Sequence, residues 1–238
     1  MMKILAVSGS PRIEKRSSTL KLVKAVADNT GCEYDLISLA GKKFTGCIGC
    51  GLCFDDNTCK LKDDLTPLRD KIIEADAYIF GGCNFFSILN ANMHAFLERF
   101  YQFRHHENND LHGKPAVTVS VAGLHTDPVA NVLKQFCMYN FIQVVDSVEG
   151  IGAPNCFYCS YGETCKVGGV VAKYGEGFKI TEENIPCVSK DPVCMEKARQ
   201  AGKNLGKILK NGHDRAKTTQ EIREALMAMG NRLTEGAH

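Results

Sequence analysis

The chain has 238 residues, of which 44% are hydrophobic and 24% are charged, and its net charge is +2 at pH 7. This composition is that of a globular protein, and the lack of Lys/Arg tracts argues against a nucleic-acid partner. The apolar run in residues 1–7 is too short for a signal peptide or a membrane-spanning helix, so we expect a cytoplasmic protein that contacts no membrane. Twelve cysteines in such a chain favour metal or redox chemistry over a disulfide scaffold.

Apolar runs typical of buried strands alternate with segments of helical periodicity. Strands are expected at residues 3–8, 33–39, 77–82, 116–122 and 141–148. Apolar residues at helical spacing predict a helix after each of the first four strands, the second beginning at Asp63 or Asp64, and a fifth near residues 198–209. This order predicts an α/β fold with a doubly wound, five-stranded parallel sheet. Its ligands should bind beyond the carboxyl ends of the strands.

A phosphate-binding site is predicted at the end of the first strand. The segment 8–12, Ser-Gly-Ser-Pro-Arg, leads into the segment 16–19, Arg-Ser-Ser-Thr, where a helix is expected to begin. Backbone N–H groups, hydroxyls and guanidinium groups would meet there at the positive end of the helix dipole. The pattern is neither a GxGxxG turn nor a Walker loop. A plain Ser-rich helix cap is the alternative, but the position directly after the first strand of a parallel sheet favours phosphate.

Four cysteines lie close together in the connection that follows the second predicted strand. Cys47, Cys50, Cys53 and Cys59 have the spacing C-x2-C-x2-C-x5-C on a loop that also carries glycines. One such segment could supply four thiolates to a cubane iron–sulfur cluster. Tetrahedral zinc also accepts four thiolates, but its two C-x2-C pairs are usually separated by a longer spacer. We therefore predict a [4Fe–4S] cluster within residues 41–62.

These motifs together resemble a known family. Residues 9–19 are similar to the FMN-phosphate loop of the flavodoxin-like NAD(P)H-dependent FMN reductases, and residues 82–87 and 92–99 are similar to the isoalloxazine loop and helix of that family. The cysteine run at this position resembles the branch called iron–sulfur flavoproteins. The resemblance covers residues 1–150, for which it implies a flavodoxin-like FMN-binding core. It also implies that neighbouring subunits bring cluster and flavin together.

The resemblance further implies which residues bind FMN. The family usually has Pro at the position of Cys83 and Tyr at the position of Phe85, so hydrogen bonding near the flavin ring differs in this chain. Cys83 is either a small core residue or one that tunes the flavin. His105 and His106 follow a predicted helix and are expected in a solvated turn. The predicted phosphate ligands are Ser10, Arg12, Ser17, Ser18 and Thr19, and the residues predicted to contact the ring are Cys83, Asn84, Phe85, Phe86, Ser87, Gly123 and His125.

A second group of cysteines lies in residues 151–195, which read as a strand-poor insertion. Cys156, Cys159 and Cys165 repeat the C-x2-C-x5-C spacing of the last three cysteines of the first group. Cys187 or Cys194 could supply a fourth ligand. The insertion therefore carries either a second metal site or free, redox-active thiols.

Residues 196–238 are expected to form C-terminal helices. An apolar stripe follows a polar linker at residues 211–219 and predicts either an interface between subunits or a helix folded back on its own domain. We expect the interface, in a homodimer or homotetramer. The stripe consists of Ile222, Ala225, Leu226, Met229 and Leu233.

Three functions are open at this point. The first is an oxidoreductase that relays electrons between a ferredoxin-like one-electron carrier and an acceptor, because FMN exchanges both hydride and single electrons. The second is an NAD(P)H-dependent reductase of free flavin, quinones or nitro compounds. The third is a non-catalytic redox or metal sensor. No catalytic side chain is predicted, because no Ser-His-Asp or paired-carboxylate pattern stands out.

Overall fold

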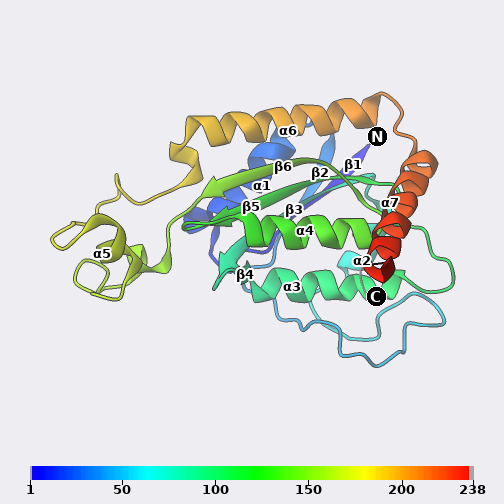
Figure 1. Ribbon diagram of the computed structural model, residues 1–238, viewed down its shortest axis with the longest axis horizontal. Coiled ribbons are helices and arrows are strands. Elements are labelled where there is room, and N and C mark those ends of the chain that lie inside the picture. Colours follow the sequence, from blue (N-terminus) through cyan, green and yellow to red (C-terminus); the bar gives the residue numbers. More distant parts are fainter. Residues whose placement is uncertain (1, 236–238) are drawn as a thin grey trace.

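The computed structural model describes residues 2–235 of the chain. Five strands run parallel in the order β2-β1-β3-β5-β6 (Figure 1), which confirms the predicted flavodoxin-like α/β fold. The sheet has a sixth strand that the sequence did not predict: β4 pairs antiparallel with the end of β3. The strands are β1 (Lys3–Ser8), β2 (Glu33–Ser38), β3 (Ala77–Phe85), β4 (Ile88–Leu89), β5 (Pro115–Ala122) and β6 (Gln143–Ile151).

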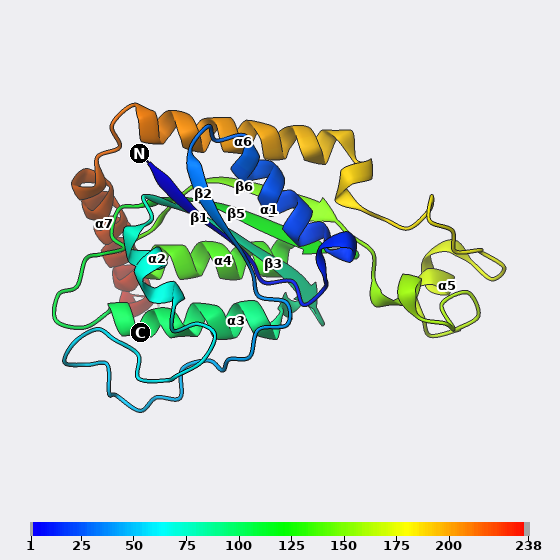
Figure 2. The ribbon, with the colours of Figure 1, turned by 180° about the vertical axis from the view of Figure 1, so that it is seen from behind.

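Helices cover both faces of the sheet (Figure 2). α1 (Ser18–Asp28) and α6 (Pro192–Lys210) pack on one face, and α2 (Leu68–Glu74), α3 (Ala91–Glu98) and α4 (Asp127–Tyr139) pack on the other. Every residue of β5 is buried between these layers, which explains its nearly continuous apolar sequence. The remaining helical segments are η1 (Glu14–Arg16), η2 (Arg99–Phe103), η3 (Asn155–Tyr158), α5 (Gly169–Tyr174), η4 (Val188–Lys190) and α7 (Arg215–Glu235).

The predicted start of the second helix is wrong, because α2 begins at Leu68 and not at Asp63 or Asp64. The Asp63 carboxylate accepts a hydrogen bond from the Leu65 N–H at 3.0 Å, and the Thr66 hydroxyl accepts one from the Asp63 N–H at 3.0 Å. These bonds hold residues 63–66 in a turn that competes with helix formation.

The predicted linker at residues 211–219 is also too long, since α7 already begins at Arg215. The Asp214 carboxylate accepts a hydrogen bond from the Lys217 N–H at 2.9 Å and so caps the helix. The ends of two strands differ from the prediction as well. β3 continues to Phe85 because its last residues pair with β4, and β6 runs on to Ile151 because it pairs with β5 along its whole length.

The connections that follow β1, β3, β5 and β6 meet at the carboxyl edge of the sheet. Gly9 allows α3 to approach the first of them closely, because a Cβ there would lie 2.4 Å from the Cβ of Met93. Residues 152–191 connect β6 to α6, form only short helices and turns, and project beyond this edge (Figure 1). They correspond to the predicted insertion.

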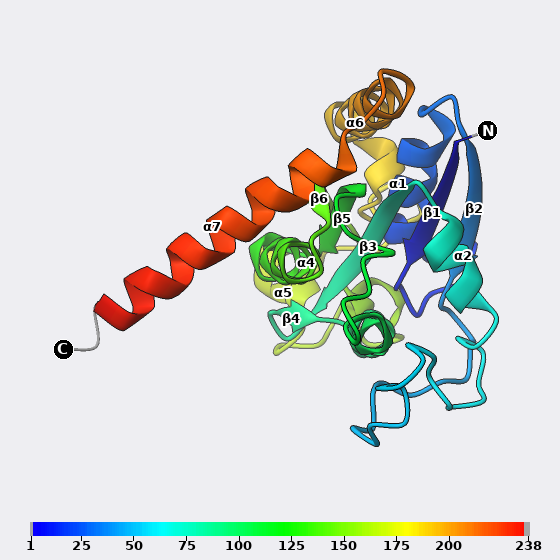
Figure 3. The same cartoon turned by 90° about the vertical axis from the view of Figure 1, so that its right-hand side faces the viewer.

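Two further segments lie outside the layered core. Residues 39–67 connect β2 to α2 and carry the first cysteine group along the outer side of α3 (Figure 2). Helix α7 extends away from the body of the protein (Figure 3). No helix within residues 2–235 is long and apolar enough to span a membrane.

A buried lysine, Lys114, lies directly before β5, at the end of the sheet opposite the larger set of connections. Lys114 is only 2% exposed, and its ammonium group donates a hydrogen bond of 2.6 Å to the carbonyl of Ile73 at the end of α2. Burial lowers the pKa of Lys114 to about 8 from an ordinary value of 10.5. The folded protein therefore binds fewer protons than the unfolded chain between these two pH values.

We expect this lysine to make the protein more stable at alkaline pH. From pH 8 to 10.5, Lys114 should add to the free energy of unfolding, by at most about 1.4 kcal/mol per pH unit. Below pH 8 the Lys114 side chain is protonated in both the folded and the unfolded chain, so the destabilisation from burying its charge is fully present. Urea unfolding of the wild type and of Lys114→Met across this interval measures the effect. Equal pH slopes for the two proteins would contradict it.

Candidate functional site

A cavity of about 680 Å³ opens beyond the carboxyl ends of the central strands. It lies where the strand order reverses, between β1 and β3, which is the usual ligand position in such sheets. All of the residues predicted to bind FMN line this cavity, with the exception of Ser17. The cavity is formed by the loop after β1, the β3–β4 turn, the loop after β5 and the insertion.

The end of the cavity at which phosphate binding was predicted is formed by the start of α1. Ser17 is buried, and its hydroxyl accepts a hydrogen bond from the Leu20 N–H at 3.0 Å, so this residue serves as the helix cap. Ser18 and Thr19 stand in the first turn and line the cavity. Ser10 also lines it, and its hydroxyl accepts a hydrogen bond from the Arg12 N–H at 3.2 Å. Hydroxyl groups and the positive end of α1 thus meet at one place, as phosphate binding requires.

Arg12 also connects the phosphate loop to the insertion. Its guanidinium group donates hydrogen bonds to the carbonyl of Ala153 at 2.7 Å and to Asn155 Oδ1 at 2.6 Å. The guanidinium groups of Arg12 and Arg16 each lie 5.0 Å from the centre of the Tyr158 ring. The insertion is therefore held on the phosphate loop by polar and cation–π contacts.

The β3–β4 turn forms the other end of the cavity. Phe86 and Ser87 have φ angles of 53° and 61°, an uncommon conformation for residues other than glycine. Asn84 holds this turn, since its side chain accepts a hydrogen bond from the Ser87 N–H at 2.9 Å and donates one to the carbonyl of His125 at 2.8 Å. One amide thus joins the two loops that were predicted to contact the flavin ring.

Cys83 lies between these two ends of the cavity. Burial raises the pKa of the Cys83 thiol to about 11, although Arg12 and a hydrogen bond with Thr19 act in the opposite direction. The thiol is therefore neutral at physiological pH. It offers a small, polarisable surface to the cavity rather than a charged nucleophile.

Asn90 is a site residue that the sequence analysis missed. It is 3% exposed and precedes α3 at the N-cap position. Its side chain donates a hydrogen bond of 2.6 Å to the carbonyl of Gly9 and accepts one of 3.1 Å from the Cys83 N–H. It therefore holds the loop after β1 against the last residues of β3. An Asn between a strand and a helix was the only local signal for this role.

The sequence analysis also missed the contribution of the insertion to the cavity. It considered this segment only for its cysteines. In the structure, side chains of η3 and α5 form the wall opposite the strands. Pro154 packs so closely on Gly123 that a Cβ at the glycine would lie 2.7 Å from its Cγ. The added wall residues are Ala153, Asn155, Phe157, Ala172, Lys173, Tyr174 and Pro186.

A second cavity of about 500 Å³ lies on the other side of α3 and is lined by Cys47, Cys50, Cys53 and Cys59. Side chains of α3 and η2 hold the backbone of this loop. Glu98 accepts a hydrogen bond from the Cys47 N–H at 3.2 Å, and Gln102 accepts one from the Cys59 N–H at 3.0 Å. Gly46 permits this approach, because a Cβ there would collide with the Glu98 carboxylate. The loop is thus attached to a helix of the core.

Arg99 places a buried guanidinium group beside this second cavity. The residue is 5% exposed and lines the cavity, and its Nη1 donates to Asp63 at 2.5 Å and to the carbonyl of Thr45 at 3.2 Å. Its Nε is buried and has no hydrogen-bond partner among the described residues. The guanidinium group brings a positive charge to a cavity lined by four thiols, which suits an anionic ligand.

His105 and His106 lie in a turn after η2, as predicted, but His105 is only partly exposed there. Its Nε2 lies 3.5 Å from Cys53 Sγ, and its ring packs edge-on against Phe54 at 4.6 Å. Its backbone N–H donates to Asn57 Oδ1 at 3.0 Å, so this contact is made by a loop distant in sequence. His106 is exposed.

The spacing of the sulfur atoms indicates which kind of metal group the loop could hold. Within the described residues, no three His, Cys, Asp or Glu side chains are close enough together to hold a metal ion. A cubane of four irons and four sulfides is wider than one ion, so its thiolate ligands stand further apart. The four thiols around one cavity, the Gly49 N–H that donates to Cys47 Sγ at 3.4 Å and the positive charge of Arg99 fit such an anionic cluster.

The cysteines of the insertion lie in two environments. Cys156 Sγ accepts a hydrogen bond from the Gly169 N–H at 3.3 Å, and the sulfur of Cys165 lies against the neighbouring Gly168. Cys187 and Cys194 lie instead against the core: Cys187 Sγ is 3.4 Å from Lys21 Nζ on α1 and 3.1 Å from Ser189 Oγ on η4, and Cys194 donates to the carbonyl of Glu149 on β6. The second metal site stays a prediction.

Comparison with known proteins adds an independent line of evidence. The model of the family described as NADPH-dependent FMN reductase matches residues 2–152. An iron–sulfur flavoprotein of Methanocaldococcus jannaschii is 28% identical over 213 residues, which cover 88% of this chain and 98% of that protein. An iron–sulfur flavoprotein of Archaeoglobus fulgidus is 30% identical over 107 residues, which cover 44% of this chain and 48% of the relative.

Solved structures show the same fold. The crystal structure of RosB with a bound 8-demethyl-8-formylriboflavin-5'-phosphate intermediate aligns with a TM-score of 0.60 at 14% identity, over 100% of this chain and 88% of RosB. The residues matched by the family model include β1, β3 and β5, whose ends form the larger cavity. The chain therefore belongs to the NADPH-dependent FMN reductase family and is an FMN-dependent oxidoreductase.

Proposed function

We propose that the protein is an iron–sulfur flavoprotein that relays electrons between a one-electron carrier of the ferredoxin type and an acceptor. The observation that carries this proposal is that one continuous helical segment, α3 with η2, is bonded at its start to the loops that form the larger cavity and lines the smaller cavity at its end. Asn90 at its start binds the loops of the larger cavity, and Glu98 and Gln102 hold the cysteine loop. The two regions are separated by roughly two helical turns, about 12 Å along the axis.

The larger cavity would hold FMN. Ser10, Ser18 and Thr19 would bind the phosphate at the start of α1, with Arg12 beside them. Asn84 would keep the β3–β4 turn and the His125 loop in place beside the flavin ring. When bound, FMN can take up or give two electrons at once, whereas an iron–sulfur cluster passes one at a time, so the pair couples two-electron to one-electron transfer.

The smaller cavity would hold a [4Fe–4S] cluster on Cys47, Cys50, Cys53 and Cys59. The Arg99 guanidinium would face the negative charge of the group, and the Gly49 N–H would donate to a ligand sulfur. His105 beside Cys53 would restrict the access of water to that sulfur. Each of these residues belongs to this chain, so a single subunit would form the complete cluster site.

An alternative within the same family is direct reduction of the flavin by NAD(P)H, with quinones, nitro compounds or free flavin as acceptors. The family description favours it, since it names NADPH. The cluster would then be auxiliary. The sensor hypothesis is set aside, because the chain belongs to a family of oxidoreductases.

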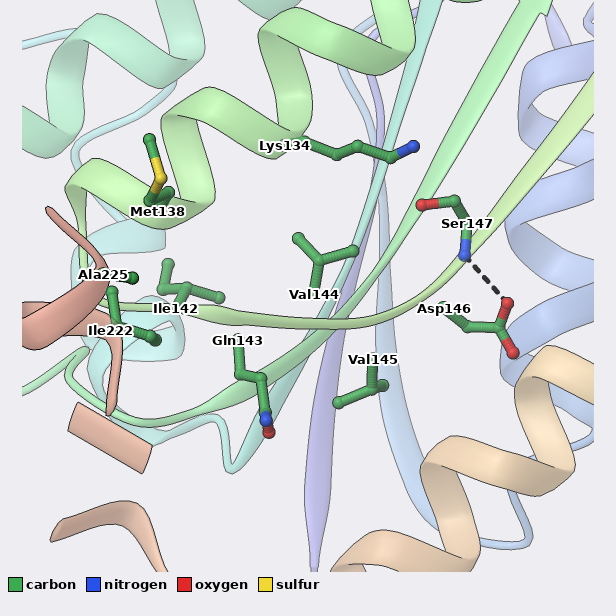
Figure 4. A pocket seen from close by; sticks show the side chains of 10 residues that line it. All are labelled: Lys134, Met138, Ile142, Gln143, Val144, Val145, Asp146, Ser147, Ile222 and Ala225. Atoms are coloured by element: carbon green, nitrogen blue, oxygen red, sulfur yellow. Dashed lines mark hydrogen bonds between the residues drawn. The ribbon is translucent and has the colours of Figure 1, made fainter. Parts of the chain in front are cut away.

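We also propose a homodimer or homotetramer. Ile222 and Ala225 line a cavity of about 430 Å³ with α4 and β6 (Figure 4), so the beginning of the predicted stripe packs on its own domain. Further along α7, which extends from the body, Met227 is 62% exposed and Met229 is 42% exposed (Figure 3). Such apolar exposure fits a contact with a second subunit. Leu233 lies outside the residues whose side chains are described.

The first prediction concerns the electron route. Cys53→Ala should abolish the broad visible absorbance of an iron–sulfur cluster and leave FMN bound, because the two cavities are separate. In the relay, reduced ferredoxin should reduce the flavin of the wild type but not that of the variant. Anaerobic absorption spectroscopy, with iron, sulfide and FMN quantified per chain, measures both effects.

Cys32→Ala is the matched control, because this cysteine is half-buried and lines neither cavity. It should behave like the wild type. If anaerobically prepared, iron-replete protein contains zinc and no iron, the cluster proposal is wrong. If NADPH reduces the flavin fast and reduced ferredoxin does not reduce it, the electron relay is wrong and the direct NAD(P)H-dependent reductase is favoured.

A second prediction separates two neighbouring serines. Ser18→Ala should weaken FMN binding by about 1–2 kcal/mol, and Arg12→Ala with Ser18→Ala by about 2–4 kcal/mol, because bonds to a charged phosphate are lost. Ser17→Ala should instead lower the free energy of unfolding by about 1 kcal/mol through loss of the helix cap, with FMN affinity unchanged. Titration of the deflavinated wild type and variants with FMN measures these affinities. Equal FMN affinities for all the variants would refute the assigned phosphate site.

The third prediction concerns assembly. Light scattering on the FMN-loaded protein should give the mass of two or four chains. Leu226→Glu with Met229→Glu should shift the protein toward the monomer, since a charge in an apolar interface is costly to desolvate. Lys217→Glu, on an exposed position at the start of the same helix, is the control and should keep the assembly. A wild-type monomer at micromolar concentration would rule the proposal out.

A further inference from the structure

In the described part of the chain, His105 is the one residue whose side chain is hydrogen-bonded to a sulfur of the first cysteine group. Its Nε2 lies 3.5 Å from Cys53 Sγ. The other hydrogen bond to a sulfur of this group comes from a backbone amide, the Gly49 N–H, and reaches Cys47. Cys47 is exposed, whereas Cys53 is only partly exposed, so the surroundings of the Cys53 sulfur are set more by the protein than by water.

Two aromatic neighbours fix the orientation of the His105 ring. It packs edge-on against Phe54, with 4.6 Å between ring centres, and against Tyr101, with 5.1 Å between ring centres. Phe54 follows Cys53 directly in the chain, and Tyr101 belongs to η2. The cysteine loop and the helical segment therefore both contact the ring, and its position does not depend on the bond to the sulfur alone.

The backbone of His105 is attached to the same loop. Its N–H donates to Asn57 Oδ1 at 3.0 Å, and the Asn57 N–H donates to the carbonyl of Cys53 at 3.0 Å. The Asn57 carbonyl accepts hydrogen bonds from Arg69 Nε and Nη2, each at 3.3 Å. One asparagine thus binds both the residue that carries the sulfur and the residue that carries the ring, which fixes the distance between them.

The chemistry of this contact determines which atom is the donor. A cysteine that ligates iron is a thiolate, which has no proton and can only accept a hydrogen bond. The bond to Cys53 therefore requires a proton on His105 Nε2. A hydrogen bond to a ligand sulfur partly offsets its negative charge. Because an iron–sulfur cluster becomes more negative on reduction, such a bond stabilises the reduced form more than the oxidised form.

The geometry points to His105 as the residue that raises the reduction potential of the cluster, by donating a hydrogen bond from Nε2 to the Cys53 thiolate. This inference rests on the cluster part of the proposed function and deepens it, since it names the side chain that sets how readily the cluster accepts an electron. His105 acts through Cys53 and is not itself a ligand. Asn57, Phe54 and Tyr101 position its ring.

Redox titration of the full chain, loaded with iron, sulfide and FMN and kept at one pH, tests the inference. His105→Phe keeps an aromatic ring beside Phe54 and Tyr101 but has no donor. The equilibrium constant for one-electron reduction of its cluster should fall about tenfold, which lowers the midpoint potential by about 59 mV. His105→Gln has an amide N–H in place of Nε2–H, so this constant should stay within about threefold of the wild type. Iron, sulfide and FMN contents should be equal in the three proteins.

A second measurement detects the histidine nitrogen directly. In protein labelled with nitrogen-15 histidine, pulsed electron paramagnetic resonance of the reduced cluster should show one coupled histidine nitrogen in the wild type and none in the two His105 variants. His106→Asn is the matched control, because this neighbouring histidine is exposed and has a φ of 47°, which asparagine tolerates. It should keep both the coupling and the midpoint potential.

An unchanged potential in His105→Phe would overturn the inference. An equal fall in His105→Phe and His105→Gln would overturn it as well, because the effect would then come from packing and not from the donor. Loss of iron in both variants would make His105 a ligand or a support of the loop, against the inference. If His105→Phe does not fold, the coupling in the wild type still decides: its presence supports the inference and its absence refutes it. A wild-type chain that assembles no iron–sulfur cluster would instead overturn the proposed function.

Discussion

The buried side chain of Asn90 joins the parts of the protein on which both cavities depend. Its amide bonds to the carbonyl of Gly9 in the phosphate loop and to the N–H of Cys83 at the end of β3, and its position starts helix α3. Loss of this side chain would leave two backbone groups without partners, at about 1–3 kcal/mol each. The same helix continues into the turns that hold the cysteine loop, so the position of one cavity determines that of the other.

The cysteine loop shows how a segment without regular structure is kept in place. Its backbone cannot pair with a neighbouring strand, so side chains of α3 and η2 bond to it instead. The ion pair of Arg99 with Asp63 is nearly buried, which is favourable only when its remaining donors also find partners. Arg99 also lines the cavity of the four thiols, so the guanidinium group that holds Asp63 and Thr45 stands beside the proposed cluster site.

The family core and the added segments have different roles. The matched residues build the sheet, the loop after β1 and the β3–β4 turn. The insertion supplies the opposite wall of the larger cavity, and α7 supplies exposed apolar side chains. The family core therefore forms one side of the cavity, and a segment beyond the family match forms the other.

Local patterns in the sequence determined the five parallel strands, the order of the elements, the hydroxyl-rich loop at the end of β1 and the loop with four thiols. These features depend on neighbours in the chain: a buried parallel strand is a continuous apolar run, and a helix start attracts hydroxyl side chains. Only the tertiary structure decided that Ser17 caps a helix while Ser18 lines the cavity. It also decided that His105 lies on Cys53, that Asn90 joins two loops, and that the insertion forms a wall. The Ser17 cap itself is a bond to Leu20 three residues on, but the other features depend on contacts between residues far apart in sequence, which the packing of the whole chain creates.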